Sequence, residues 1–124
     1  MLKLADPAAT YRRVAFDGYV SGCGGTQLVR LCLEDLAAAM QRAIWGEANN
    51  RRDIRTKALS RAQLGLVALL QGIDPQQPLA DVLETFYRGL MQDVTACQAR
   101  FDAARLSRAR QDVMEVTDTL FATT

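Results

Sequence analysis

The sequence predicts an all-α protein, an antiparallel up-down four-helix bundle with a short N-terminal helix or lid segment. Apolar residues recur at helical spacing along most of the chain, whereas the alternation of β-branched residues typical of strands is missing. Clusters of Gly, Asn and Pro divide the chain into stretches of about 18 to 22 residues. Helices of this length with short connections pack most simply as an up-down bundle, and 124 residues suit one domain.

The N-terminal part is expected to be a partly helical tail over residues 1–25, followed by the bundle over 26–122. Pro7 suits the first turn of a short helix near residues 8–16. The Gly-rich "SGCGGT" lacks the preceding strand and the Gly-Lys ending of a phosphate-binding loop, so it is interpreted as a plain linker. Thr26 is the expected N-cap of the first long helix, which should end near Glu47.

The segments that interrupt the helical pattern set the bounds of the other three predicted helices. After "GEANN", a second helix should start near Asp53 and end near Gly72. "GIDPQQPL" is the next break, because its two prolines cannot occupy a helix interior. A third helix is predicted over 79–100 and a fourth over 103–121, with Phe101-Asp102 as a last turn or a tight junction between them.

Each predicted helix has an apolar stripe for the core. The core candidates are Leu28, Val29, Cys32, Leu33, Leu36, Met40 and Ala43, then Ile54, Ala58, Leu59, Ala62, Leu66, Leu69, Leu70 and Ile73, then Leu79, Leu83, Phe86, Leu90, Val94 and Cys97, and finally Leu106, Ala109, Val113, Val116 and Leu120. Small residues are expected to allow close helix approach at Ala39, Ala58, Ala62 and Gly65. Cys32 and Cys97 are interpreted as small core hydrophobes.

Several apolar residues remain after the core stripes are removed. The leftover residues, which are the candidate partner-binding residues, are Leu31, Ala38, Trp45, Leu64, Val67, Met114 and Phe121. Isolated apolar residues are common on protein surfaces, and the tail carrying Tyr11 could fold back over one of the stripes. A partner's amphipathic helix lying in a groove is the other explanation. Both can hold if the tail is a displaceable lid, for which Tyr11 is the candidate residue.

Composition argues against several classes of function. The chain contains no histidine and no familiar nucleophile or nucleotide motif, so no enzyme activity, cofactor or metal is expected. A net charge of +1 and the basic run "RRDIR", which lacks neighbouring aromatic residues, argue against a nucleic-acid partner. Three cysteines without C-x-x-C spacing and no long apolar run favour a reduced, cytoplasmic location without a membrane span.

With these features the sequence resembles the flagellar secretion chaperone family (FliS-type) over about residues 8–120. The resemblance lies in the order and spacing of Tyr11, "QLVRLCLEDL", "TKALSRAQLGLVALLQGID" with its Lys57-Ala58 pair, "LADVLETFYRGL" with Phe86-Tyr87, and "FDAARLSRARQDVMEV". Two features depart from the family pattern. "SGCGGT" stands where a short Ser/Thr-Ala-Ser-Pro-like segment is usual, and Leu33-Glu34-Asp35 stands where a Leu-Tyr pair is usual.

The resemblance implies a cytoplasmic export chaperone that binds the C-terminal helical segment of flagellin, prevents premature polymerisation and aids delivery to the flagellar export apparatus. It further implies that the Tyr11 region sits against the bundle where the client binds. The departures leave open another flagellar protein as the client. The alternative is a helical homodimeric adaptor or regulatory module of flagellar assembly, in which the leftover stripes meet a second copy.

Overall fold

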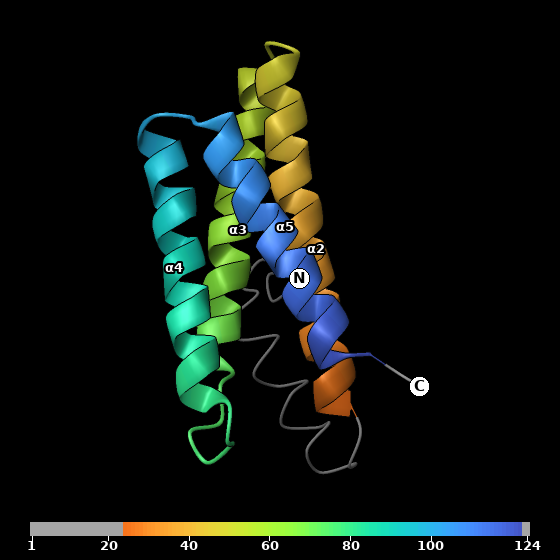
Figure 1. Ribbon diagram of the computed structural model, residues 1–124. Helices are drawn as coiled ribbons and strands as arrows, with labels where there is room; N and C mark the ends of the chain where they lie inside the picture. The colour runs from red at the N-terminus through yellow and green to blue at the C-terminus, as the bar shows by residue number, and fades with distance from the viewer. Residues whose placement is uncertain (1–23, 123–124) are drawn as a thin grey trace, which may run out of the picture.

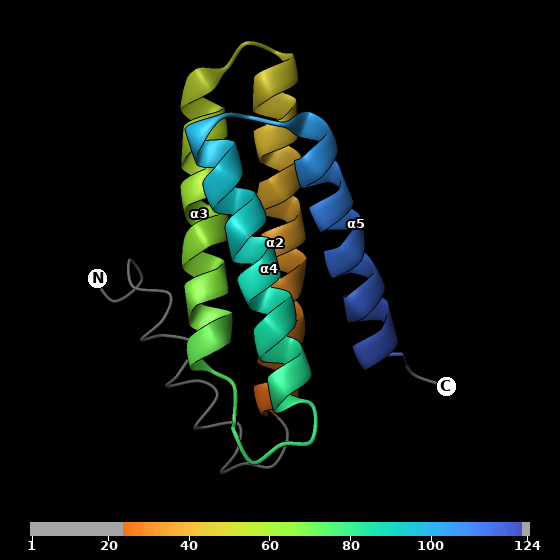
Figure 2. The same cartoon turned by 60° about the vertical axis from the view of Figure 1, so that its left-hand side comes forward.

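Four helices form the part of the chain that the computed structural model describes, residues 24–122. They are α2 (Gly24–Ala48), α3 (Arg52–Gln71), α4 (Ala80–Ala99) and α5 (Ala103–Leu120). Each runs antiparallel to the one before it, and Figures 1 and 2 show them side by side as an up-down bundle. The predicted all-α four-helix fold is confirmed, with helix ends within about two residues of those expected.

The packing order follows the chain. α2 packs against α3 and α5, and α4 packs against α3, whereas the interface between α4 and α5 is the loosest of the four. The backbones of α2 and α4 do not approach each other closely, and neither do those of α3 and α5, so these pairs lie diagonally across the bundle.

The core is continuous and almost wholly apolar. Its fully covered side chains include Leu33, Met40, Ala62, Leu66 and Val94, and a domain of this size depends on such burial for most of its stability. Tyr87, which the stripe analysis left out, is only 2% exposed. Thr117, also left out, is buried, and its hydroxyl is satisfied by donating to the carbonyl of Val113 at 2.7 Å.

The turn between α2 and α3 closes with a Schellman-type motif. Asn50 adopts a left-handed conformation with φ of 56°, the amide of Arg51 donates to the Gly46 carbonyl at 2.7 Å, and the amide of Asn50 donates to the Glu47 carbonyl at 3.3 Å. Asparagine tolerates this conformation better than most residues. "GEANN" therefore ends the helix through its backbone geometry.

Three sequence expectations are wrong. α2 begins at Gly24, so Thr26 lies inside the helix and is not its N-cap. Leu79 is 48% exposed and not part of the core, because it is the N-cap residue of α4 at the edge of the bundle. A Cβ placed on Gly65 would meet nothing within 4 Å, so close helix approach does not require glycine there. At Gly46, by contrast, a Cβ would lie 2.8 Å from the Arg55 nitrogen.

Candidate helix-binding surface

The outward side of α2 carries an apolar stripe, Leu31, Ala38 and Trp45, all exposed. Leu31 is 58% exposed and Trp45 47%, values high for such large apolar side chains. Their seven-residue spacing keeps them on one line of the helix, about 21 Å long from Leu31 to Trp45. The predicted stripe is therefore present and uncovered among the described residues.

Leu31 of α2 and Leu64 of α3 lie at about the same level along the bundle. Arg61 of α3 binds Asp35 of α2 through two hydrogen bonds of 3.2 and 3.3 Å, which fixes the register of the helices. Leu31 lies one turn before Asp35, and Leu64 about one turn after Arg61. Because the helices are antiparallel, both leucines lie on the same side of this ion pair. Leu64 is also exposed.

The other predicted partner-binding residues differ from one another in exposure and in position. Val67 is partly buried, and it is rotated about 60° from Leu64 around α3, on the side away from α2. Met114 of α5 is exposed. Phe121 is partly buried against the core, and the guanidinium of Arg30 lies 6.0 Å from its ring centroid. The structure therefore keeps Leu31, Ala38 and Trp45 on one line of α2 and places Leu64 of α3 at the level of Leu31. Val67, Met114 and Phe121 lie elsewhere on the bundle. Tyr11, the lid candidate, lies outside the described residues.

Two exposed apolar residues of α4 were not among the predicted partner-binding residues. Val82 is 63% exposed and, like Leu79, lies near the start of α4. The spacing of Leu79, Val82 and Phe86 at i, i+3 and i+7 would have shown that they share one side of a helix. The sequence could not show that this side stays uncovered, because its exposure depends on how α5 packs.

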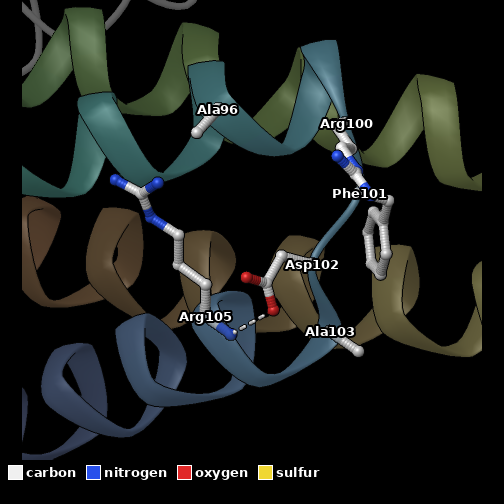
Figure 3. A pocket seen from close by; sticks show the side chains of 6 residues that line it. All are labelled: Ala96, Arg100, Phe101, Asp102, Ala103 and Arg105. Carbon is white, nitrogen blue, oxygen red and sulfur yellow. Dashed lines mark hydrogen bonds between the residues drawn. The ribbon is translucent and has the colours of Figure 1, made fainter.

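A shallow pocket lies at the other end of α4, around the junction with α5 (Figure 3). It is lined by Ala96, Arg100, Phe101, Asp102, Ala103 and Arg105. The polar groups of two of these residues are already used within the fold. Asp102 Oδ1 accepts from the backbone amide of Arg105 at 3.1 Å, and Arg105 Nε donates to Asp93 Oδ1 at 2.7 Å. The hydrogen bonds of Asp102 and Arg105 therefore stabilise the junction between α4 and α5.

The two titratable groups with the largest pKa shifts lie within the bundle. Burial, with a smaller contribution from the negative charge of Asp35, raises the pKa of Cys32 to about 11. Burial, with a smaller contribution from Cys32, raises the pKa of Tyr87 to about 12. Both groups are protonated at neutral pH, so the Cys32 thiol is a poor nucleophile. Residues 24–122 hold no group of three Cys, Asp or Glu residues that could bind a metal ion.

The fold therefore defines the chain as an all-α four-helix bundle. No helix in the described part of the chain has the length and apolar character needed to cross a membrane. No protein-family model, curated protein or solved structure matches the chain.

Proposed function

We propose that the chain is an export chaperone of the FliS type that binds the C-terminal helical segment of flagellin in the cytoplasm. The observation that carries the proposal is the exposed apolar surface on α2 and α3, formed by Leu31, Ala38, Trp45 and Leu64. The order of sequence features that resembles the flagellar chaperones also supports it.

This surface has the chemistry needed to hold an amphipathic client helix. Burying Leu31, Trp45 and Leu64 would contribute on the order of 1.5 to 3 kcal/mol each before other costs. Ordering a disordered client consumes about 2 to 5 kcal/mol of that gain. The balance favours binding that is specific and still reversible, as release of a client for export requires. Covering the client's apolar face would also prevent its self-association.

The test is fluorescence anisotropy with a labelled C-terminal segment of flagellin. We expect the double variant Leu31→Ser/Leu64→Ser to raise the Kd at least about tenfold, because two apolar contacts are lost. Its thermal midpoint should stay within a few degrees of the wild type, since both side chains are exposed in the free protein. Val82→Ser is the control, because it removes an exposed apolar side chain from a different helix.

Two outcomes would contradict the proposal. One is a wild-type chain that does not bind the segment. The other is a stable dimer in sedimentation that dissociates when Leu31 and Trp45 are changed to Ser, which would favour the homodimeric adaptor. A large fall in the thermal midpoint of the double variant would instead show that the two leucines stabilise the fold.

A further inference from the structure

The apolar stripe of α2 is bordered by positive charge that the described part of the fold does not neutralise. The four carboxylates of α2 and α3 all form ion pairs, which are Glu34 with Arg30, Asp35 with Arg61, Glu47 with Arg55, and Asp53 with Arg51. Arg42 of α2 and Lys57 of α3 are exposed, and neither forms an ion pair with another residue of 24–122.

Arg42 lies beside the stripe on the same helix. It follows Ala38 by four residues and precedes Trp45 by three, and side chains at these spacings are neighbours on a helix surface. Ala38 is exposed, and Trp45 is 47% exposed. A helix that covers this part of the stripe therefore passes beside the guanidinium of Arg42.

Lys57 borders the same part of the stripe from α3. The ion pair between Asp35 and Arg61 fixes the register of the two helices. Arg42 lies seven residues after Asp35, and Lys57 lies four residues before Arg61, so both are displaced from the ion pair toward the turn at residues 49–51. Each also lies on the side of its helix that carries a member of the pair. The two cations therefore differ by only about 4.5 Å in level along the bundle.

Arg110 of α5 is a third cation, on the other side of α2. Its Nε atom is buried and has no hydrogen-bond partner in the part of the chain that the structure describes. The ring of Phe121 in α5 lies under the guanidinium of Arg30 in α2. Eleven residues, about three turns, separate Arg110 from Phe121 and also Gln41 from Arg30. Arg110 is therefore level with Gln41, the neighbour of Arg42.

The carboxylates of α5 do not neutralise this region. Asp112 and Glu115 are rotated about 160° and 140° around α5 from Arg110, so they face away from α2. Asp118 lies eight residues, about 12 Å, further along α5 toward the level of Arg30. The half of the stripe nearest the turn between α2 and α3 is therefore the positively charged half.

We infer that the stripe selects a client helix that carries carboxylates beside its apolar face, in the half nearest the turn between α2 and α3. This inference rests on the proposed function, because it specifies the chemistry of the client at the same surface. Arg42 and Lys57 face these carboxylates from one side of the client helix, and Arg110 faces them from the other. Nucleic acid is a poorer occupant, because its phosphates gain nothing from contact with Leu31 and Ala38.

The experiment is fluorescence anisotropy with two labelled synthetic helical peptides that share one leucine face, one flanked by glutamates and the other by lysines. At low salt the glutamate peptide should bind about tenfold tighter, and the difference should shrink at high salt. Arg42→Glu/Lys57→Glu should raise the Kd of the glutamate peptide at least about tenfold, because attraction becomes repulsion.

The matched control is Arg52→Glu/Arg108→Glu, which makes the same change in net charge. Both arginines are exposed and form no ion pair within residues 24–122. Arg52 is rotated about 140° around α3 from Lys57, and Arg108 about 160° around α5 from Arg110. This control should change the Kd of the glutamate peptide less than about twofold.

Three results would overturn the inference. These are equal binding of the two peptides, a preference that Arg42→Glu/Lys57→Glu leaves unchanged, and binding of a single-stranded oligonucleotide as tight as that of the glutamate peptide. A dimer in sedimentation that the same double variant dissociates would also overturn it, because the cations would then serve a second copy of the chain.

The inference and the proposed function can fail separately. Suppose that the flagellin segment binds and Leu31→Ser/Leu64→Ser weakens it, while the two synthetic peptides bind equally. The proposed function would then stand and the inference would fall. A preference for the glutamate peptide that Arg42→Glu/Lys57→Glu abolishes, without binding of the flagellin segment, would support the inference and exclude flagellin as the client.

Discussion

Gly46 and Gly65 are both helical glycines, but their surroundings differ. A Cβ at Gly46 would lie 2.8 Å from the Arg55 nitrogen and 3.0 Å from the Arg51 carbonyl oxygen, both backbone atoms. Gly46→Ala should therefore destabilise the fold by about 1 to 3 kcal/mol, because the start of α3 must move. Gly65→Ala is the control and should stabilise it by about 0.5 to 1 kcal/mol, since the new methyl group meets nothing. Urea unfolding of both variants measures whether each substitution lowers or raises the free energy of unfolding.

Cys32 and Tyr87 predict a loss of stability in alkaline solution. Folding raises the pKa of Cys32 from 9.0 to about 11 and that of Tyr87 from 10.0 to about 12. The folded state therefore favours the protonated forms. The stability that these two groups contribute should be constant below about pH 9 and fall as the pH rises toward 12, because the unfolded chain loses these protons first.

Single variants separate the two contributions to this alkaline loss. Cys32→Ala should remove the part between about pH 9 and 11, and Tyr87→Phe the part between about pH 10 and 12. Urea midpoints measured from about pH 7 to 12 check this. A wild-type midpoint that is flat over that range would contradict it.

At the scale of the element, the stability of α5 depends on the residue that caps its N-terminus. Asp102 is its N-cap, and the side chain accepts a hydrogen bond from the Arg105 amide at 3.1 Å. Asp102→Ala should cost about 0.5 to 2 kcal/mol, and Asp102→Asn much less, because asparagine also caps helices well. Asp81→Ala is the control in the first turn of α4, where no side-chain cap bond is present. Thermal unfolding of the three variants should rank them in this order.

The helix boundaries were predictable because the residues that end helices, such as Gly, Asn and Pro, act locally. "GEANN" and "GIDPQQPL" contain residues that terminate helices whatever the tertiary structure. The errors concern tertiary contacts. Leu79 has the spacing of a core residue, yet it is exposed at the edge of the bundle. The small size of Gly65 suggested close packing of a neighbouring helix, but a Cβ at this position would meet nothing within 4 Å.

At the scale of the whole molecule, the sequence predicted which residues would be left outside the core better than it predicted how they group. Leu31, Trp45 and Leu64 are exposed as expected. The level of Leu64 relative to Leu31 depends on helix register, which the ion pair between Asp35 and Arg61 reveals. The exposed apolar residues at the start of α4, Leu79 and Val82, were missed for a related reason, because their exposure depends on how the neighbouring helix packs in the assembled bundle.

The central claim is that a flagellin segment folds onto the exposed apolar surface of α2 and α3. Isothermal titration calorimetry of the chain with the C-terminal segment of flagellin, repeated at several temperatures, tests it most directly. We predict saturable binding with a clearly negative heat-capacity change, which marks apolar burial and coupled folding, and a much smaller change for Leu31→Ser/Leu64→Ser. No saturable heat with the wild-type chain, or an equal heat-capacity change for both proteins, would contradict the claim.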